Sequence, residues 1–179
     1  MTEPLQTITL GGGCFWCTDA VFSRLKGVTD VTCGYSNGHV QRPSYEQVCS
    51  GATGHNEVVQ VTFDPTQIGL RQLLTVFFGT HDPTTLNQQG NDIGTQYRSG
   101  IYVSNEDQRK TALDFIAELG RDRVFKKPVV TEVEALDNYW PAEAYHQDYF
   151  EQHPNTGYCS FVVEPKVAKL RKSFSALLK

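Results

Sequence analysis

A cysteine directly after three glycines is the residue in this sequence best placed to do chemistry. Residues 11–13 are glycines that follow a short apolar run, and apolar residues at helical spacing come after Cys14. This pattern predicts a strand, a glycine turn and a helix that begins near Cys14. Because free N–H groups and the helix dipole favour an anion there, we expect a reactive thiolate with a lowered pKa. The alternative is a structural cysteine buried beneath Phe15 and Trp16, the aromatic residues that would otherwise form a pocket wall.

A carboxyl group at the start of a predicted strand is the second candidate. Side chains in a strand alternate, so Glu57 shares a face with Val59, Val61 and Phe63. Since this face is apolar, we expect burial to raise the pKa of Glu57 and keep it protonated near neutral pH. A protonated carboxyl group beside a nucleophile is a candidate general acid. The alternative is that Glu57 is exposed at a frayed strand end.

The other thiols suggest a redox cycle. Five cysteines is an odd number, which argues against a closed set of structural disulfides and favours thiol chemistry or metal binding. A thiolate that takes oxygen from a substrate becomes a sulfenic acid, which a second thiol converts to a disulfide. Cys159 is a candidate second thiol because it follows residues 151–158, a turn-forming run that we expect to be mobile. Cys17 competes with it, one helical turn from Cys14.

Strands and helices separated by two long polar segments must position these groups. The apolar pattern predicts strands at 5–10, 28–35, 57–63, 101–103 and 129–136, and helices at 15–26, 68–78, 105–119, 142–150 and 166–179. The polar segments 39–56 and 81–99 are long enough to be functional. We predict an α+β fold in which helices cover a mostly antiparallel or mixed sheet. The chain, 1–179, fits one catalytic domain, with residues 151–179 as a docked, partly irregular tail that ends in an amphipathic helix.

Composition and charge exclude several classes of protein. The net charge is −4 and the pI is about 5.7, without the basic face that a nucleic-acid-binding protein needs. No segment is as long and apolar as a membrane span. Residues 1–4 lack the basic region and apolar core of a signal peptide, so we expect a cytoplasmic protein. We also expect a monomer with no bound cofactor.

Several motifs, in order along the chain, resemble those of the peptide methionine sulfoxide reductase A family. They are GCFW at 13–16, PSYEQVCSG at 43–51, TGHNE at 53–57, HDP at 81–83, GNDIGTQYRS at 90–99, HQ at 146–147 and GYC at 157–159. The resemblance spans about residues 7–160. It implies a reductase that converts peptide-bound or free methionine S-sulfoxide to methionine, with thioredoxin as its reductant. It also implies an α/β sandwich on a ferredoxin-like core.

The resemblance implies a role for each matching residue in the first motif and in the TGHNE motif. Cys14 matches the nucleophile that accepts the sulfoxide oxygen. Glu57 matches the acid that protonates this oxygen, in agreement with the strand pattern. Phe15 and Trp16 match the aromatic residues that hold the S-methyl group of the substrate.

Further matches complete the implied site, with departures from the family pattern at Cys17 and Asp19. Tyr45 and Tyr97 match two hydroxyl donors to the sulfoxide oxygen, and Asp92 matches a polar residue that orders the pocket. Cys159 matches the recycling cysteine. Many members have Gly where this chain has Cys17, so the identity of the resolving thiol stays open among Cys159, Cys17 and a third candidate, Cys33. We assign no redox role to Cys49, because a free cysteine is more often simply packed.

Two other functions compete with this interpretation. The C-x-x-C sequence at 14–17 is typical of thiol–disulfide oxidoreductases, although thioredoxin-type motifs usually carry the Trp before the first Cys. A zinc-held interaction module could use Cys14 and Cys17 with two more ligands; the candidates are Cys33, Cys49, His39 and His55. A structural zinc site normally shows two paired ligand spacings, and this sequence has one C-x-x-C pair. We therefore expect no metal site.

Overall fold

The computed structural model describes residues 4–179, so most of the segment behind the signal-peptide prediction, residues 1–3, lies outside it. Six strands form one mixed sheet in the order β7-β6-β1-β3-β2-β8, in which β6 and β7 are parallel and the other neighbours antiparallel. The strands are β1 (Gln6–Gly11), β2 (Val28–Ser36), β3 (Asn56–Phe63), β6 (Gly100–Val103), β7 (Glu132–Ala135) and β8 (Tyr139–Pro141). A separate hairpin pairs β4 (Gln88–Gln89) with β5 (Asp92–Ile93). The predicted α+β class with a mixed sheet is confirmed.

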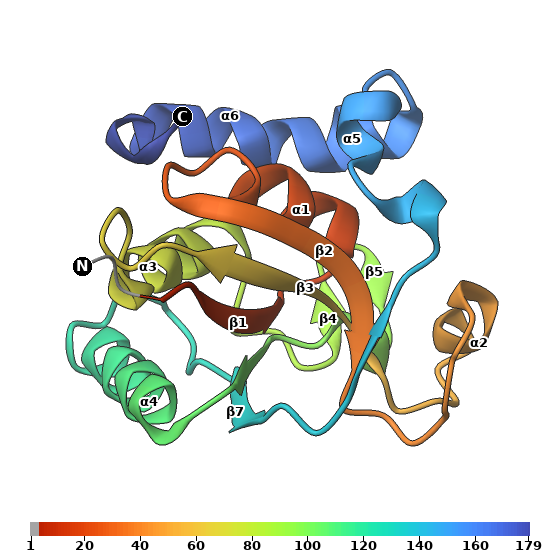
Figure 1. Ribbon diagram of the computed structural model, residues 1–179, viewed down its shortest axis with the longest axis horizontal. Helices are drawn as coiled ribbons and strands as arrows, with labels where there is room; N and C mark the ends of the chain where they lie inside the picture. The colour runs from red at the N-terminus through yellow and green to blue at the C-terminus, as the bar shows by residue number, and fades with distance from the viewer. Residues whose placement is uncertain (1–3) are drawn as a thin grey trace.

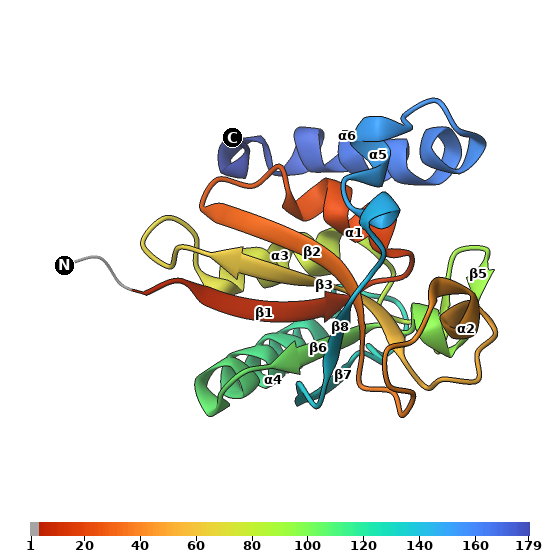
Figure 2. The same ribbon diagram turned by 45° about the vertical axis from the view of Figure 1, so that its right-hand side comes forward.

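Helices cover the sheet in two tiers. The α-helices are α1 (Phe15–Phe22), α2 (Tyr45–Cys49), α3 (Leu70–Thr80), α4 (Glu106–Arg121), α5 (Tyr149–Gln152) and α6 (Glu164–Ser173). Side chains of α1, α3 and α4 share one apolar cluster with the sheet. In both views α6 lies beyond α1, on the side away from the sheet, and α2 stands at one end of the molecule (Figure 1 and Figure 2).

Local sequence explains the elements that were predicted well. In β3 the alternate residues Val59, Val61 and Phe63 are almost fully buried, as a period of two requires. In α4 the Asn105 side chain accepts a hydrogen bond from the Gln108 N–H and so caps the helix. The period of two explains the buried face of β3, and the Asn105 cap explains where α4 begins.

The helix predicted at 15–26 ends early, at Phe22. The residues after it pair with the carboxyl end of the chain instead. The Lys26 N–H donates to the Leu177 carbonyl, and the Lys179 N–H donates to the Arg24 carbonyl. Backbone bonds to a distant segment thus replace the last helical turn.

The helix predicted at 142–150 is wrong. The preceding residues form β8 on the edge of β2, and a 3-10 turn (Ala144–His146) and the short α5 follow. Asp148 has a φ of +53°, which no continuous helix can accommodate. The helix predicted at 166–179 begins two residues earlier, at Glu164, and ends at Ser173; a 3-10 turn (Ser175–Leu177) comes after it.

The polar segments 39–56 and 81–99 contain short ordered elements. The first holds α2, and the second holds the β4–β5 hairpin and a 3-10 turn (Thr95–Tyr97). The Ser44 side chain accepts from the Gln47 N–H, and the Gln47 side chain accepts from the Ser44 N–H. This capping box is a sequence signal that would have predicted α2.

The sheet places the glycine turn next to Glu57. Strands β1 and β3 are antiparallel with Leu10 opposite Val59, so the end of β1 that leads to Cys14 lies beside the start of β3. Within the part of the chain that the structure describes, no helix has the length and apolarity needed to cross a membrane.

Candidate active site

Cys14 is the N-cap residue of α1, as the glycine turn predicts. Gly13 has a φ of +98°, and a Cβ atom there would lie 2.6 Å from Cγ of Gln89, so both the turn and the close packing require glycine. Cys14 is 7% exposed and lines a cavity of about 450 Å³. It is therefore a buried cysteine that keeps access to an open space.

The predicted pKa shift of Cys14 is wrong in direction. Burial raises the pKa of the Cys14 thiol well above its usual value, and the nearby Glu57 and Cys17 raise it further. The Trp16 N–H and the Tyr158 hydroxyl act in the opposite direction but do not outweigh burial. The helix terminus donates to the sulfur, yet the loss of solvent around a charged thiolate costs more. At neutral pH the Cys14 side chain is therefore a protonated thiol.

Glu57 lies at the start of β3 and is 1% exposed, so the predicted burial is confirmed. One carboxyl oxygen, Oε1, accepts a 3.3 Å hydrogen bond from the Phe15 N–H. The other, Oε2, has no partner among residues 4–179. Burial raises the pKa of Glu57 to about 8, despite the Phe15 bond, which lowers it. Glu57 thus carries a proton at neutral pH and has one oxygen free of protein contacts.

The aromatic residues after Cys14 form a packed wall. Phe15 is fully buried, and its ring stacks on Tyr45 with 6.3 Å between ring centroids. Trp16 stacks on Tyr149 at 3.8 Å with the planes 7° apart. The Trp16 Nε1–H donates to Nδ1 of His146 at 3.0 Å, and burial lowers the pKa of His146, which keeps that nitrogen an acceptor. The orientation of Trp16 is thereby fixed from both sides.

Tyr45, Tyr97 and Asp92 come from the two polar segments and meet near Cys14. Tyr45 begins α2, Tyr97 ends the 3-10 turn after the hairpin, and Asp92 lies in β5. Burial raises the pKa of both tyrosines, and Glu57 raises it further, so both hydroxyls stay protonated donors. Glu57 and Cys14 both influence the two tyrosines, so the residues expected in the site lie in one region, but of the seven only Cys14 and Asp92 line the cavity.

Tyr158 is a site residue that the motif comparison did not single out. Its hydroxyl donates a 2.6 Å hydrogen bond to Oδ2 of Asp92, and its ring meets Trp16 edge-on at 5.6 Å. Together with Cys14, Asp92 and the exposed Phe161 it lines the cavity. His146 and Tyr149 are two further residues that were missed. The signals for them in the sequence were the HQ motif at 146–147 and the cluster of Tyr and His in the segment that follows β8.

The expected position of Cys159 on a mobile tail is wrong. Cys159 begins a π-helical turn (Cys159–Val163) that leads directly into α6, and it is fully buried. It packs with Cys17, Phe150 and Val167 in a small apolar cluster separate from the main core. The apolar side chains that follow Cys159 at helical spacing hold it against α1.

The remaining cysteines have different surroundings. The Cys33 thiol lies in the main core, where its Sγ contacts the Phe15 carbonyl at 3.7 Å and Oδ2 of Asp19 at 3.6 Å. Cys49 is exposed at the end of α2. Across residues 4–179 there is no group of three or more His, Cys, Asp or Glu side chains that could hold a metal ion.

Comparison with known proteins gives consistent matches over nearly the full chain. The family model described as Peptide methionine sulfoxide reductase matches residues 6–178. A protein of Polynucleobacter asymbioticus named Peptide methionine sulfoxide reductase MsrA is 52% identical over 174 residues, which cover 97% of this chain and 92% of that protein.

Solved structures agree with the sequence matches. The crystal structure of Mxr1 from Saccharomyces cerevisiae in reduced form has a TM-score of 0.80 and 35% identity, and the match covers 89% of this chain and 92% of that one. Mxr1 in complex with Trx2 has a TM-score of 0.56 and 26% identity over 83% of this chain and 88% of that one. The family model and a relative with 52% identity both cover almost the whole sequence, so this chain belongs to the peptide methionine sulfoxide reductase family.

Proposed function

We propose that this protein reduces methionine S-sulfoxide, free or within peptides and proteins, and that thioredoxin returns it to its reduced form. The observation that carries the proposal is the pairing of Cys14, at an open cavity, with Glu57, a buried carboxyl group whose pKa is about 8. Reduction of a sulfoxide requires two groups, a sulfur nucleophile and an acid that is still protonated at neutral pH.

The reductive step transfers one oxygen atom. The Cys14 sulfur attacks the sulfoxide sulfur while Glu57 delivers its proton to the oxygen, and the Tyr45 and Tyr97 hydroxyls donate hydrogen bonds to the same oxygen. The oxygen then passes to the Cys14 sulfur as a sulfenic acid, and the thiol proton restores Glu57. The sulfoxide gains two electrons and becomes methionine, and the Cys14 sulfur loses the same two electrons. Because Cys14 begins as a thiol, its proton must leave as the sulfur–sulfur contact forms.

Aromatic surfaces and one carboxylate position the substrate in this proposal. The face of Trp16 that is not stacked on Tyr149 would contact the S-methyl group, which is apolar and fits an aromatic wall. The Phe15 ring is fully buried, so the packing around it must open before Phe15 can join this contact. Asp92 acts as a positioning residue because it accepts a hydrogen bond from the Tyr158 hydroxyl at the edge of the cavity.

A second thiol regenerates the enzyme. We assign this role to Cys159, with Cys17 and Cys33 as alternates: its thiol displaces hydroxide from the sulfenic acid, which leaves a disulfide and water. Support for a thiol in this segment comes from the shared cluster of Cys17 and Cys159 beside α1. Since Cys159 is fully buried, the π-helical turn must move before Cys159 can pair with Cys14 or meet a reductant. A dithiol such as thioredoxin then opens the disulfide, and support for this partner comes from the structural likeness to Mxr1 in complex with Trx2.

We propose a ferredoxin-like unit made of β6, β1, β3 and β2 with the helices α1 and α3; the strand order and antiparallel pairing support it. We further propose a single catalytic domain over 1–179, a docked tail over 151–179, a monomer with no bound cofactor, and a cytoplasmic location.

One assay tests the function. Purified protein with thioredoxin, thioredoxin reductase and NADPH should oxidise NADPH when given an N-acetylated peptide that contains methionine S-sulfoxide, and the Cys14→Ser variant should not. The same peptide with the R-sulfoxide serves as the control for epimer choice. Insulin reduction without sulfoxide turnover would instead support a thiol–disulfide oxidoreductase and refute the proposal.

A further inference from the structure

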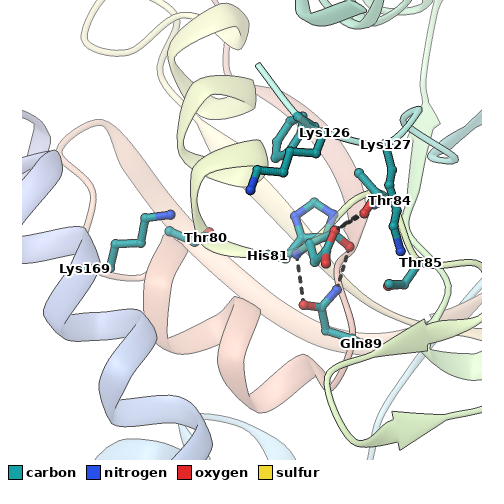
Figure 3. Close-up of a pocket in the computed structure, with 10 residues that line it drawn as sticks. Thr80, His81, Thr84, Thr85, Gln89, Lys126, Lys127 and Lys169 are labelled. Carbon is teal, nitrogen blue, oxygen red and sulfur yellow. Dashed lines mark hydrogen bonds between the residues drawn. The ribbon is translucent and has the colours of Figure 1, made fainter. Parts of the chain in front are cut away.

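A second cavity, of about 560 Å³, lies close to the one at Cys14. It is bordered by the end of α3, the segment after α4 and one side of α6. Figure 3 shows Lys126 and Lys127 on the segment after α4 and Lys169 across from them on α6, around His81. We call the space bordered by Lys126, Lys127 and Lys169 the lysine pocket.

The lysine pocket holds an excess of positive charge. None of its three lysines forms an ion pair with a carboxylate of residues 4–179, whereas four arginines elsewhere do. Asp82 is the carboxylate that lines the pocket, and its Oδ1 already accepts hydrogen bonds from the Thr84 N–H and hydroxyl. Burial lowers the pKa of His81 to about 4, so His81 adds no charge at neutral pH. In a chain of net charge −4, a group of unpaired lysines is suited to an anion.

One side chain separates the lysine pocket from Cys14. Gln89 lines both cavities. It packs against Gly13, and two 2.9 Å hydrogen bonds fix its amide to the backbone of Asp82, as the dashed lines in Figure 3 show. A peptide that places a residue at Cys14 can therefore reach the lysines past Gln89.

A fourth lysine continues the positive charge to the catalytic cavity. Lys166 lines the cavity at Cys14, and Lys169 lies one helical turn further along α6 on the same side. Among the described residues, Lys166 too has no ion-pair partner. The positive charge thus forms a path from the nucleophile to the pocket.

We propose that the lysine pocket binds acidic side chains of the substrate, so that the enzyme favours methionine sulfoxide within acidic segments of peptides and proteins. This inference rests on the proposed function and deepens it. An extended peptide advances about 3.3–3.6 Å per residue. A carboxylate roughly two to four residues from the sulfoxide can therefore extend past Gln89 from the cavity at Cys14 into the lysine pocket. A peptide is the occupant because the pocket opens beside the cavity in which a methionine side chain must lie.

Three matched peptides test the proposal. Each contains one methionine S-sulfoxide flanked at two to four residues on both sides by Asp, by Asn or by Lys, and dithiothreitol replaces thioredoxin so that reductant binding is not a variable. The wild-type protein should show a kcat/KM about three- to tenfold higher for the Asp peptide than for the Lys peptide, mainly through KM, as expected for a few exposed ion pairs. The ratio should approach one at high salt, because salt screens exposed charges.

Charge-reversal variants locate the effect. The K126E/K127E/K169E variant should reverse the preference and leave kcat/KM for the Asn peptide within about twofold. The control variant K110E/R121E/K172E has the same change in net charge at exposed positions outside the lysine pocket, and it should keep the wild-type preference. The inference is overturned if the wild-type protein reduces the Asp and Lys peptides at equal rates, or if K126E/K127E/K169E keeps the wild-type preference. In either case, reduction of the Asn peptide still upholds the proposed function. If none of the peptides is reduced, the proposed function itself is wrong.

Discussion

The Tyr158 hydroxyl donates a 2.6 Å hydrogen bond to Asp92, and this bond joins the C-terminal segment to the β4–β5 hairpin. Asp92 and Tyr158 are 66 residues apart in the sequence. Tyr158 directly precedes Cys159, so the contact that borders the cavity at Cys14 also holds the buried Cys159 thiol in place. Burial and the nearby Cys14 raise the pKa of Tyr158, which keeps its hydroxyl a donor throughout the working pH range.

We predict that Tyr158→Phe makes Cys159 more accessible. A hydrogen bond to a carboxylate contributes about 1.5–3 kcal/mol, so its loss should favour local opening of the π-helical turn. The rate at which iodoacetamide modifies Cys159, followed by peptide mass spectrometry, should rise about tenfold or more. Cys33, in the main core, is the internal control and should react at the wild-type rate. Equal acceleration at Cys33 would indicate global destabilisation rather than release of this segment.

Glu57→Gln tests the proton donor. The variant keeps an oxygen that accepts from the Phe15 N–H but has no proton to give to the sulfoxide. We expect a loss of at least about 100-fold in the rate of the first turnover, the usual scale for a general acid. In the wild-type protein this rate should fall as the pH rises through about 8, where Glu57 loses its proton. Rapid quench of a single turnover measures both effects, and a variant within a few-fold of wild type would refute the assignment.

The sequence was sufficient to predict the two central residues because local patterns control them. The period of two in residues 57–63 places Glu57 on the buried face of β3, and the glycine turn places Cys14 at the start of α1. The N-cap of α4 at Asn105 was predictable for the same reason. Each of these features depends on residues only a few positions away.

Features that depend on distant contacts were not predictable. The pKa of Cys14 moves opposite to the helix-dipole expectation because its burial depends on the whole fold. Trp16 is oriented by His146, which lies 130 residues further along the chain. Cys159 follows turn-forming residues, yet it is ordered because its neighbours pack on α1. A motif match can name such residues, but spacing alone cannot show what they touch.

Variants of the second thiol distinguish the possible resolving residues. We predict that Cys159→Ser reduces about one equivalent of sulfoxide and then stops with thioredoxin as the reductant, because the sulfenic acid on Cys14 has no partner. The amount of methionine formed per protein chain, measured by chromatography, gives the number of turnovers. Sustained cycling by this variant would move the resolving role to Cys17 or Cys33. Cys17→Ser is the matched control because Cys17 lies in the same apolar cluster, and it should keep cycling if Cys159 resolves directly.

The buried carboxyl group of Glu57 should also lower stability at neutral pH. Its pKa is raised from 4.5 to about 8 in the folded protein, so between these values the folded state holds a proton that the unfolded state has lost. The free energy of unfolding contributed by Glu57 must therefore fall as the pH rises through this window and level off above it. Glu57→Gln removes this dependence, because its amide does not titrate.

Urea unfolding at intervals from about pH 5 to about pH 9 measures this effect as a difference between two proteins. The stability of Glu57→Gln minus that of the wild type should increase with pH up to about 8 and stay constant beyond it. All other titrating groups are present in both proteins, so their contributions largely cancel in the difference. Parallel stability curves would mean that Glu57 is already ionised in the folded protein at neutral pH, and Glu57 could then not be the proton donor.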